Sequence, residues 1–223
     1  DKLAIAAEFA KENPELFERN VKALQENQPE FIPISGIDFG LGTIYIPIDM
    51  YRDFMYETFE TSSWAKINDY GSNRNAVDIK YNELLNNWTI VNKTAERNSV
   101  KVNEVFGTKR MNAYEIMEAS LNLKRVEIKD KKYVDNSNGE TVEKYVLNKN
   151  ETMLARERQS KIENAFKKWI LADPKRAERI ETIYNNTYNV IKPRSYDGSY
   201  VNVPGLNPQI KLRPHQLNSV ARI

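Results

Sequence analysis

A long amphipathic pattern that is broken by an Asp-Pro pair is the feature that most constrains the fold of this chain. Apolar residues recur at helical spacing and predict one helix over residues 149–172. Asn148, followed three positions later by Glu151, is typical of a capped helix start. Pro174 cannot continue that helix but suits the first turn of another one. We therefore expect a helical hairpin that begins near residue 149 and organises much of the core.

The two helices of this hairpin are expected to share one core. In the first helix, Trp169 lies on the apolar stripe with Phe166 and Ile170, so we interpret its indole as a core side chain rather than a base-stacking platform. Lys167 and Lys168 lie off the stripe, where they are candidates for contacts with DNA phosphates. The second helix is expected to present to the same core Ala177, Ile180, Tyr184 and Tyr188.

Periodicity predicts further helices and two small sets of strands elsewhere. The other helices are expected over residues 2–12, 14–27, 47–59 and 109–123. Strands are expected at residues 43–46, in a hairpin over 77–91, at 100–106, and in a second hairpin that pairs 125–128 with 142–147. Because no strand and helix alternation indicates a parallel sheet, we expect an α+β fold, mostly helical with small antiparallel hairpins or a small antiparallel sheet.

Two turn-rich stretches carry alternative interpretations. The glycines between Gly36 and Gly42 resemble a phosphate loop only in composition, because no Lys-Ser/Thr pair follows them, so we expect a glycine-rich turn. Asp135 to Gly139 consists of turn-forming residues and marks the tip of the second hairpin. That tip is either a plain hairpin end or a loop that contacts a partner.

Shifts in composition and periodicity divide the chain into four segments. They are an acidic helical lead-in with a short strand at 1–60, hairpins and one helix at 61–147, a helical hairpin and connector at 148–203, and the start of a further domain at 204–223. The alternative is that all four segments form one compact domain.

Composition excludes several classes of site. The chain has no cysteine and one histidine, His215, which excludes disulfides and thiolate metal sites and argues against a histidine-based zinc or iron site, so we expect no metal. No nucleophile with a partner base can be named, so we expect no catalysis from this chain alone. It has neither a long apolar run nor a secretory leader, which favours a soluble cytoplasmic protein without membrane contact.

The net charge of +2 hides an asymmetry. Residues 1–60 carry 12 acidic and 5 basic side chains, whereas residues 187–223 carry 1 acidic and 5 basic ones. A basic C-terminal part beside an acidic N-terminal part fits a nucleic-acid contact at one end. An ordinary solvated surface explains the same imbalance, and the sequence leaves both readings open.

A basic and aromatic run connects the helical hairpin with the C-terminal part. Lys192 and Arg194 flank a proline, with Tyr196 close behind, and Lys211 follows further along. Lysine and arginine can bind phosphates while a tyrosine stacks on a base, so these residues are candidate DNA contacts. The alternative is an extended connector that lies across the helical hairpin.

The run Leu212-Arg-Pro-His-Gln216, which is expected to start a helix near Pro214, carries a resemblance. It is similar to the glutamine motif that opens the first motor domain of Swi/Snf-like superfamily-two helicases and translocases. The resemblance implies that Gln216, with Arg213 and His215 beside it, contacts the adenine of ATP, and that ATP and Mg²⁺ act with the motor domain that would follow. The apolar stripe still runs at Ile223, so we expect a piece of a longer protein.

Further upstream runs extend this resemblance over most of the chain. They are Leu41-Gly-Thr-Ile-Tyr-Ile-Pro47, Phe106-Gly-Thr-Lys-Arg110, Asn112-Ala-Tyr-Glu-Ile116, Phe166-Lys-Lys-Trp-Ile170 and Tyr184-Asn-Asn-Thr-Tyr-Asn189. As a set they resemble the region between modules in large methyltransferase/helicase proteins of phages, plasmids and integrative elements. This resemblance implies an accessory region that binds DNA for the motor, with the methyltransferase and helicase modules as neighbours. The alternative is a structural bridge that docks those modules and does not contact DNA.

Overall fold

The chain divides into two units that are described separately. The computed structural model describes residues 2–67, 75–135, 141–192, 196–207 and 209–222. Residues 32–184 form one unit, here called the core unit, and residues 1–31 with 185–223 form the other, here called the hairpin-tail unit. The fold is α+β, mostly helical with two small antiparallel sheets, as the sequence predicts.

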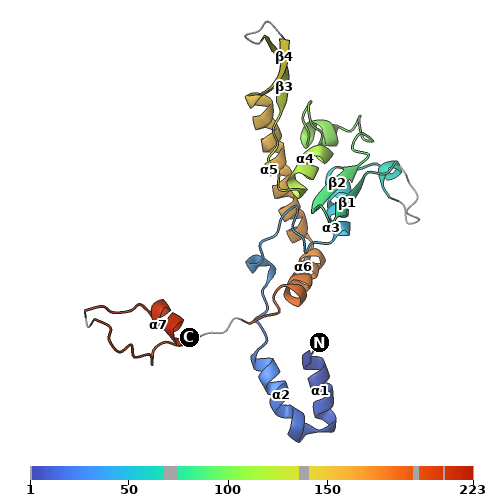
Figure 1. Ribbon diagram of the computed structural model, residues 1–223. Helices are drawn as coiled ribbons and strands as arrows, with labels where there is room; N and C mark the ends of the chain where they lie inside the picture. Colours follow the sequence, from blue (N-terminus) through green and yellow to red (C-terminus); the bar gives the residue numbers. More distant parts are fainter. Residues whose placement is uncertain (1, 68–74, 136–140, 193–195, 208, 223) are drawn as a thin grey trace. The chain divides into compact units, whose positions relative to one another are not determined.

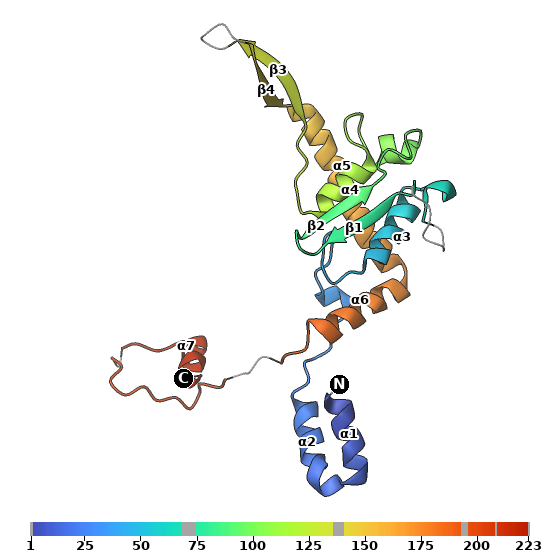
Figure 2. The same cartoon turned by 45° about the vertical axis from the view of Figure 1, so that its right-hand side comes forward.

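Helices and two-stranded ribbons alternate along the core unit (Figures 1 and 2). Its helices are α3 (Ile48–Thr58), α4 (Ala113–Leu121), α5 (Lys149–Ala172) and α6 (Pro174–Thr187), whose last residues belong to the other unit. Shorter turns are η1 (Ile34–Gly36), η2 (Ser63–Ala65) and the π-helical η3 (Lys101–Val105). The strands are β1 (Asp78–Asn82) with β2 (Asn87–Val91), and β3 (Lys129–Asp135) with β4 (Thr141–Leu147).

A cluster of aromatic rings forms the centre of the core unit. Phe166 of α5 lies against Tyr51 and Phe54 of α3, with ring centroids 5.3 and 5.0 Å apart. Phe59 and Tyr114 join the cluster edge to face at 5.5 Å. All five side chains are buried, and such contacts add to the free energy gained by removing apolar surface from water. Residues from the expected segments 1–60, 61–147 and 148–203 thus contribute to one core.

The β1–β2 hairpin and α4 confirm their predictions. Ile79 pairs with Ile90 across the hairpin and both side chains are buried. Asn86 makes the tight turn with a positive φ of 46°, a conformation that asparagine tolerates better than most residues. Asn112 and Glu115 form a complete capping box at the start of α4.

The strand predicted at residues 43–46 is wrong, because this stretch is a series of turns. The buried Tyr51 hydroxyl lies 3.1 Å from the carbonyl oxygen of Gly40 and 2.9 Å from that of Thr43, so these acceptors are satisfied without a partner strand. Gly42 has a φ of 86°, and a Cβ atom there would lie 2.3 Å from the carbonyl oxygen of Leu121. The expected glycine-rich turn is therefore confirmed, with a close backbone contact as its cause.

The strand predicted at residues 100–106 is also wrong. The segment winds into the π-helical turn η3, in which Val102 is buried. The Asn103 side-chain amide binds the carbonyl oxygens of Glu96, Arg97 and Ser99 at 2.8–3.1 Å. This side-chain competition for backbone acceptors favours a wound loop over a strand ladder, which periodicity alone does not reveal.

The second hairpin forms, but its first strand is displaced from 125–128 to Lys129–Asp135. Residues 125–128 run along α5 instead of pairing with another strand. Val126 and Ile128 donate their N–H groups to the side chains of Gln159 and Thr152, at 3.2 and 2.9 Å. Buried polar side chains on α5 therefore bind the backbone N–H groups that a partner strand would otherwise bind. The tip residues 136–140 lie outside the described residues.

The α5–α6 hairpin confirms the strongest sequence prediction. Asn148 caps α5 by accepting from the N–H of Glu151 at 3.1 Å. Trp169 packs on the core beside Phe54 and Phe166, as expected. Ile180 is buried, but Tyr188 follows the end of α6 and is 51% exposed. The expected core position of Tyr188 is therefore wrong, because the helix ends one residue earlier.

The hairpin-tail unit contains α1 (Lys2–Glu12), α2 (Pro14–Glu26) and α7 (Pro214–Ala221), close to the predicted bounds. Phe9 and Phe17 stack between α1 and α2, with centroids 5.6 Å apart. Among the described residues of this unit, only Gly198 is buried. The unit is therefore held by hydrogen bonds and one aromatic stack, and it lacks a core of its own in the described ranges. Across the described part of the chain, no helix combines the length and apolarity that a membrane span requires.

Candidate nucleic-acid interface

Residues 196–222, here called the tail, fold back on themselves around α7 (Figure 1). The N–H of Gly198 donates to Oδ1 of Asn218 on α7 at 2.8 Å. A Cβ atom at Gly198 would lie 2.2 Å from the carbonyl carbon of Leu217, so only glycine allows this approach. The turn at the start of the tail is tightened by Ser199, which donates its N–H and its hydroxyl to Asp197. These bonds hold the pKa of Asp197 below its ordinary value.

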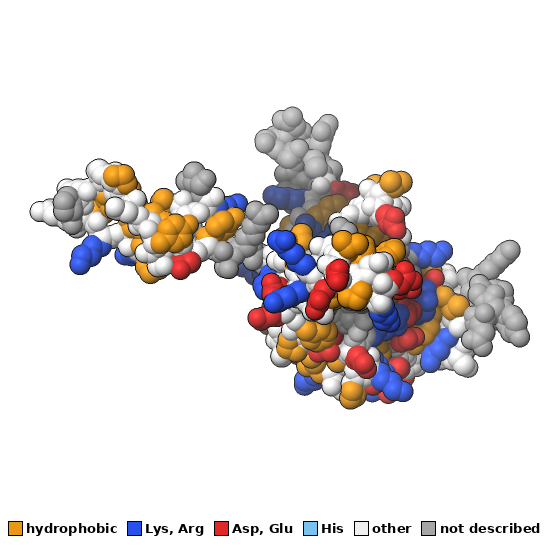
Figure 3. Space-filling view, turned by 90° about the horizontal axis from the view of Figure 1, so that it is seen from below, with side chains coloured by type: hydrophobic (Ala, Val, Ile, Leu, Met, Phe, Trp, Pro, Cys, Tyr) orange, Lys and Arg blue, Asp and Glu red, His pale blue; other side chains and the backbone are white. Residues whose placement is uncertain are grey.

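The tail exposes its cations without neutralising them. Lys211, Arg213 and Arg222 are all exposed, and none forms an ion pair with a described carboxylate. Asp197 is the one acidic residue of the tail, and its carboxylate accepts from Ser199. Figure 3 shows the tail at the left, where the visible surface carries more blue Lys and Arg atoms than red Asp and Glu atoms. This arrangement can bind anions such as phosphates.

The three residues of the glutamine motif lie together at the start of α7. Oε1 of Gln216 accepts from the backbone N–H of Arg213 at 2.8 Å, which is one half of a capping box. The His215 side chain is exposed, and its carbonyl oxygen accepts from the hydroxyl of Ser219. In this structure the Gln216 carboxamide therefore stabilises the helix start, with its NH₂ group directed to no described acceptor.

Lys192 does not belong to the free cations. Its Nζ donates to the carbonyl oxygen of Glu26 at 2.8 Å, at the C-terminal end of α2, where a cation is favourable. Tyr196 is half-buried and begins the described part of the tail, while Arg194 lies outside the described residues. The structure therefore bonds Lys192 to the end of α2 and does not group it with Lys211.

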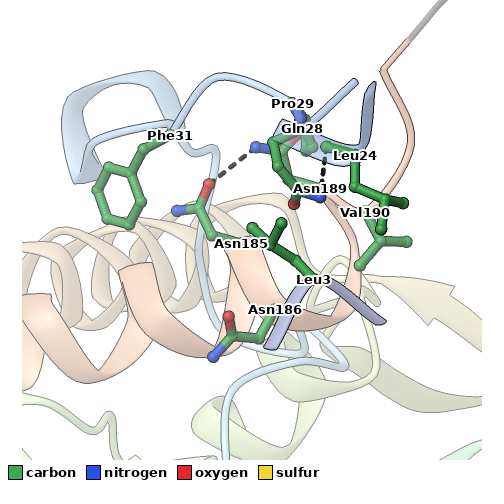
Figure 4. Close-up of a pocket in the computed structure, with 9 residues that line it drawn as sticks. All are labelled: Leu3, Leu24, Gln28, Pro29, Phe31, Asn185, Asn186, Asn189 and Val190. Carbon is green, nitrogen blue, oxygen red and sulfur yellow. Dashed lines mark hydrogen bonds between the residues drawn. The ribbon is translucent and has the colours of Figure 1, made fainter. Parts of the chain in front are cut away.

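A cavity of about 630 Å³ lies within the hairpin-tail unit, between α1, α2 and the end of α6 (Figure 4). Asn189 donates to the carbonyl oxygen of Glu30 at 2.7 Å and to Oδ1 of Asn185 at 2.8 Å. Gln28 donates to the carbonyl oxygen of Leu24 at 3.1 Å. Asn189 therefore joins the segment after α2 to the segment after α6, and both amides are bonded to the protein.

On the core unit, the structure separates the two lysines that the sequence places side by side. Lys167 borders a cavity of about 400 Å³ under the glycine-rich turn, together with Lys124 and Arg125. Lys168, the next residue of α5, does not line that cavity, because successive helical residues point about 100° apart. Its side chain is exposed on α5. Both lysines belong to the core unit, whereas the tail belongs to the hairpin-tail unit.

Sequence analysis missed Lys124 and Arg125 as candidates. They follow the end of α4 after two residues and come directly after the helix that the sequence predicts, and neither forms an ion pair with a described carboxylate. Two carboxylates share the cavity wall, Asp38 and Glu163, and Glu163 accepts from the buried Ser120 hydroxyl at 3.1 Å. The mixed lining gives this cavity a weaker preference for anions than the tail has. A Lys-Arg pair directly after a helix was the available signal.

Trp169 has both a polar and a cationic neighbour in addition to its core contacts. Its indole N–H donates to Oε2 of Glu57 at 2.6 Å, and the guanidinium of Arg176 lies 3.6 Å from the ring centroid. The Arg176 guanidinium also binds Glu57 at 3.0 Å. The ring is thus covered by protein groups, which supports its role in packing rather than as a base-stacking platform. Within the described ranges, no group of three or more acidic or histidine side chains could hold a metal ion.

Comparison with known proteins gives one family. No curated protein and no solved structure matches this chain. The sequence model of one protein family matches residues 40–190, which is more than half of the chain and includes most of the core unit. The chain belongs to the family described as Domain of unknown function (DUF8437).

Proposed function

We propose that this chain is an accessory DNA-binding region of an ATP-dependent DNA helicase or translocase that is fused to a DNA methyltransferase, in a phage or other mobile element. In this proposal it works in the cytoplasm between those two modules. The resemblance of Leu212 to Gln216 to the glutamine motif supports the link to a motor, and the free cations of the tail support the contact with DNA.

The single observation that carries the DNA contact is the unneutralised charge of the tail. Lys211, Arg213 and Arg222 are exposed on a short segment with one carboxylate, which is already bonded to Ser199. Elsewhere in the described chain many cations are neutralised, for example Arg52 by Asp78 and Arg179 by Asp49, at 2.8 and 2.6 Å. Free cations close together bind a polyphosphate by releasing its counterions.

The ATP contact belongs to the same proposal. Gln216 would present its amide to adenine only when the motor domain follows it, and Arg213 and His215 would flank that contact. ATP and Mg²⁺ are therefore ligands of the assembled motor, and this chain contributes no catalytic group of its own. On binding adenine, Oε1 of Gln216 would give up or share its bond to the Arg213 N–H, which makes the helix start the adjustable part.

The test is fluorescence anisotropy of a labelled duplex of about 20 base pairs, measured from low to near-physiological salt. We expect micromolar or tighter binding. The logarithm of the association constant should fall linearly with the logarithm of the salt concentration, with a slope of about 0.9 for each phosphate contact. Replacing Lys211, Arg213 and Arg222 with alanine should weaken binding and lower the slope by about 3. The matched control replaces Lys11, Arg19 and Lys22 of α1 and α2, three cations that change the net charge equally.

A second candidate, a structural bridge between modules, rests on a different observation. Ile5, Phe9 and Leu16 expose more than half of their side chains, and a cavity of about 530 Å³ with a largely apolar wall lies between α1 and α2. Exposed apolar surface of this kind is typical of a docking face. The bridge predicts that neither duplex nor single-stranded DNA binds even at low salt. That result would remove the DNA-binding proposal and leave the bridge.

A further inference from the structure

The β3–β4 ribbon, here called the arm, extends beyond the start of α5 in the core unit (Figures 1 and 2). None of its described side chains is buried, and it pairs with no third strand in the described part of the chain. A two-stranded ribbon without a packed face is at best marginally stable by itself. The arm therefore contributes little to the core, and its side chains are available for contacts outside the protein.

The base of the arm is fixed firmly. Asp130 accepts from Arg110 at 2.8 Å through one carboxylate oxygen and from Asn148 at 2.8 Å through the other. Asn148 also caps α5, and its own N–H donates to the carbonyl oxygen of Ile128 at 2.8 Å. The same contacts hold the pKa of Asp130 below its ordinary value. The arm is thus attached to the longest helix through one shared residue.

One face of the arm carries an unfavourable pair of charges. In the strand register Lys132 lies directly opposite Lys144, and both side chains are exposed. Like charges at opposite positions destabilise a ribbon. No described carboxylate forms an ion pair with either lysine, whereas Asp130 and Glu143 bind Arg110 and Lys131. A bound anion would relieve this repulsion.

The other face carries two exposed aromatic rings. Tyr133 and Tyr145 are 65% and 64% exposed, and the register places them diagonally across the ribbon. Lys131 lies opposite Tyr145 and places its Nζ 5.4 Å from the ring centroid of Tyr133. This face therefore carries the two aromatic rings and an ion pair of Lys131 with Glu143 at 2.6 Å, while the lysine pair occupies the opposite face.

We propose that the arm enters a groove of duplex DNA, with Lys132 and Lys144 on phosphate oxygens and the two tyrosines against sugars and base edges. A two-stranded ribbon fits the major groove, which is about 12 Å wide. Inside a groove the tyrosine face can lie toward the base edges, while the long lysine side chains reach the phosphates that flank the groove; a single strand offers no such walls. The inference rests on the proposed DNA-binding function and adds to it a second contact, on the core unit.

The experiment measures duplex affinity of the whole chain over a salt series, with variants of each face. K132A/K144A should bind at least about tenfold more weakly and lower the salt slope by about 2, because two charged phosphate contacts are lost. Y133A/Y145A should weaken duplex binding several-fold with an unchanged slope, because no charge is removed. The matched control is K80A/K175A, two exposed lysines of the core unit without a described ion pair. Circular dichroism checks that every variant folds, and folding is expected because no described arm side chain is buried.

Each outcome decides the inference. If K132A/K144A binds like K80A/K175A while the tail variant loses affinity, the arm proposal is overturned and the proposed function stands. If Y133A/Y145A loses binding only to single-stranded DNA, the groove assignment is overturned. If the unaltered chain does not bind a duplex at the lowest salt, both proposals fall. A loss for both arm variants, with the control unchanged, supports the groove contact.

Discussion

The two units of this chain are stabilised by different kinds of interaction. The core unit buries aromatic and aliphatic side chains from α3, α4 and α5 around Phe166, so packing determines its fold. In the hairpin-tail unit Gly198 alone is buried among the described residues, and caps, tight turns and one aromatic stack hold the segments. The family match covers most of the first unit and little of the second. The comparison separates a scaffold that folds by its own packing from a unit whose side chains remain available for partners.

The largest expected effect removes the centre of the core. Phe166→Ala should lower the free energy of unfolding of the core unit by about 3–5 kcal/mol, because its ring contacts Tyr51 and Phe54 and a cavity would remain. Urea unfolding followed by tryptophan fluorescence measures this directly, since all three tryptophans lie in the core unit. Leu84→Ala is the control, with a side chain 96% exposed. Equal midpoints for the two variants would contradict the description of the core.

The next effect should be confined to the tail. Gly198→Ala places a methyl group 2.2 Å from the Leu217 carbonyl carbon, which should destabilise the fold of the tail by about 1–3 kcal/mol. We expect faster amide hydrogen exchange in α7 and an unchanged urea midpoint of the core unit. Gly205→Ala tests the specificity of the clash, because a Cβ atom there meets nothing within 4 Å, although its φ of 87° adds strain without a clash. If amide exchange in α7 is unchanged in Gly198→Ala, the close contact between Gly198 and α7 does not stabilise the tail.

Alkaline pH should act on the core unit through Tyr114. Burial raises the pKa of Tyr114 to about 12. Its hydroxyl group forms a hydrogen bond with the hydroxyl group of Thr61 at 3.0 Å. The folded state holds this proton more tightly than the unfolded state does. The contribution of the hydroxyl to the free energy of unfolding is therefore complete below pH 10 and is lost as the pH rises toward 12. At pH 11 the loss should be about 1 kcal/mol. Urea midpoints at pH 9 and 11 measure it, and Tyr114→Phe should show a smaller drop; an equal drop in both would refute the assignment.

The smallest effect concerns the base of the arm at low pH. Arg110 and Asn148 lower the pKa of Asp130. The contribution of its carboxylate to the stability of the arm is therefore present above the ordinary carboxyl pKa and is lost as the pH falls below it. We expect exchange of the β3 and β4 amides to accelerate at low pH more than that of α5, after correction for intrinsic rates. Asp130→Asn should accelerate the same amides already at neutral pH. No difference between this variant and the unaltered chain would show that the arm is not anchored there.

The sequence predicted best where one local signal decides the structure. The Asp-Pro break and the Asn148 cap were sufficient for α5 and α6, and the alternation around Ile79 and Ile90 was sufficient for the first hairpin. It failed where a side chain takes over backbone hydrogen bonds. The Asn103 amide binds carbonyl oxygens before residues 100–106 and favours a helical turn where a strand was expected. The Tyr51 hydroxyl binds carbonyl oxygens at the start of the other expected strand, residues 43–46. Such contacts leave no periodic trace in a single sequence.

The candidate sites follow the same rule. The motif around Gln216 was readable because its residues are consecutive, and the structure keeps them together at the start of α7. Lys192 could not be distinguished from Lys211 in the sequence, because only the fold brings Glu26 to Lys192. The opposition of Lys132 and Lys144 depends on the strand register, which the displaced start of β3 sets. A prediction of 125–128 as the first strand pairs different residues and hides this charge pair.

Amide hydrogen exchange of the whole chain with and without a duplex of about 20 base pairs tests the central claim most directly. The account predicts slower exchange on DNA binding in two places, the tail around α7 and the described strands of the arm, with no change at the aromatic core. Exchange that is unaltered at every peptide, or slowed only in α1 and α2, would contradict it.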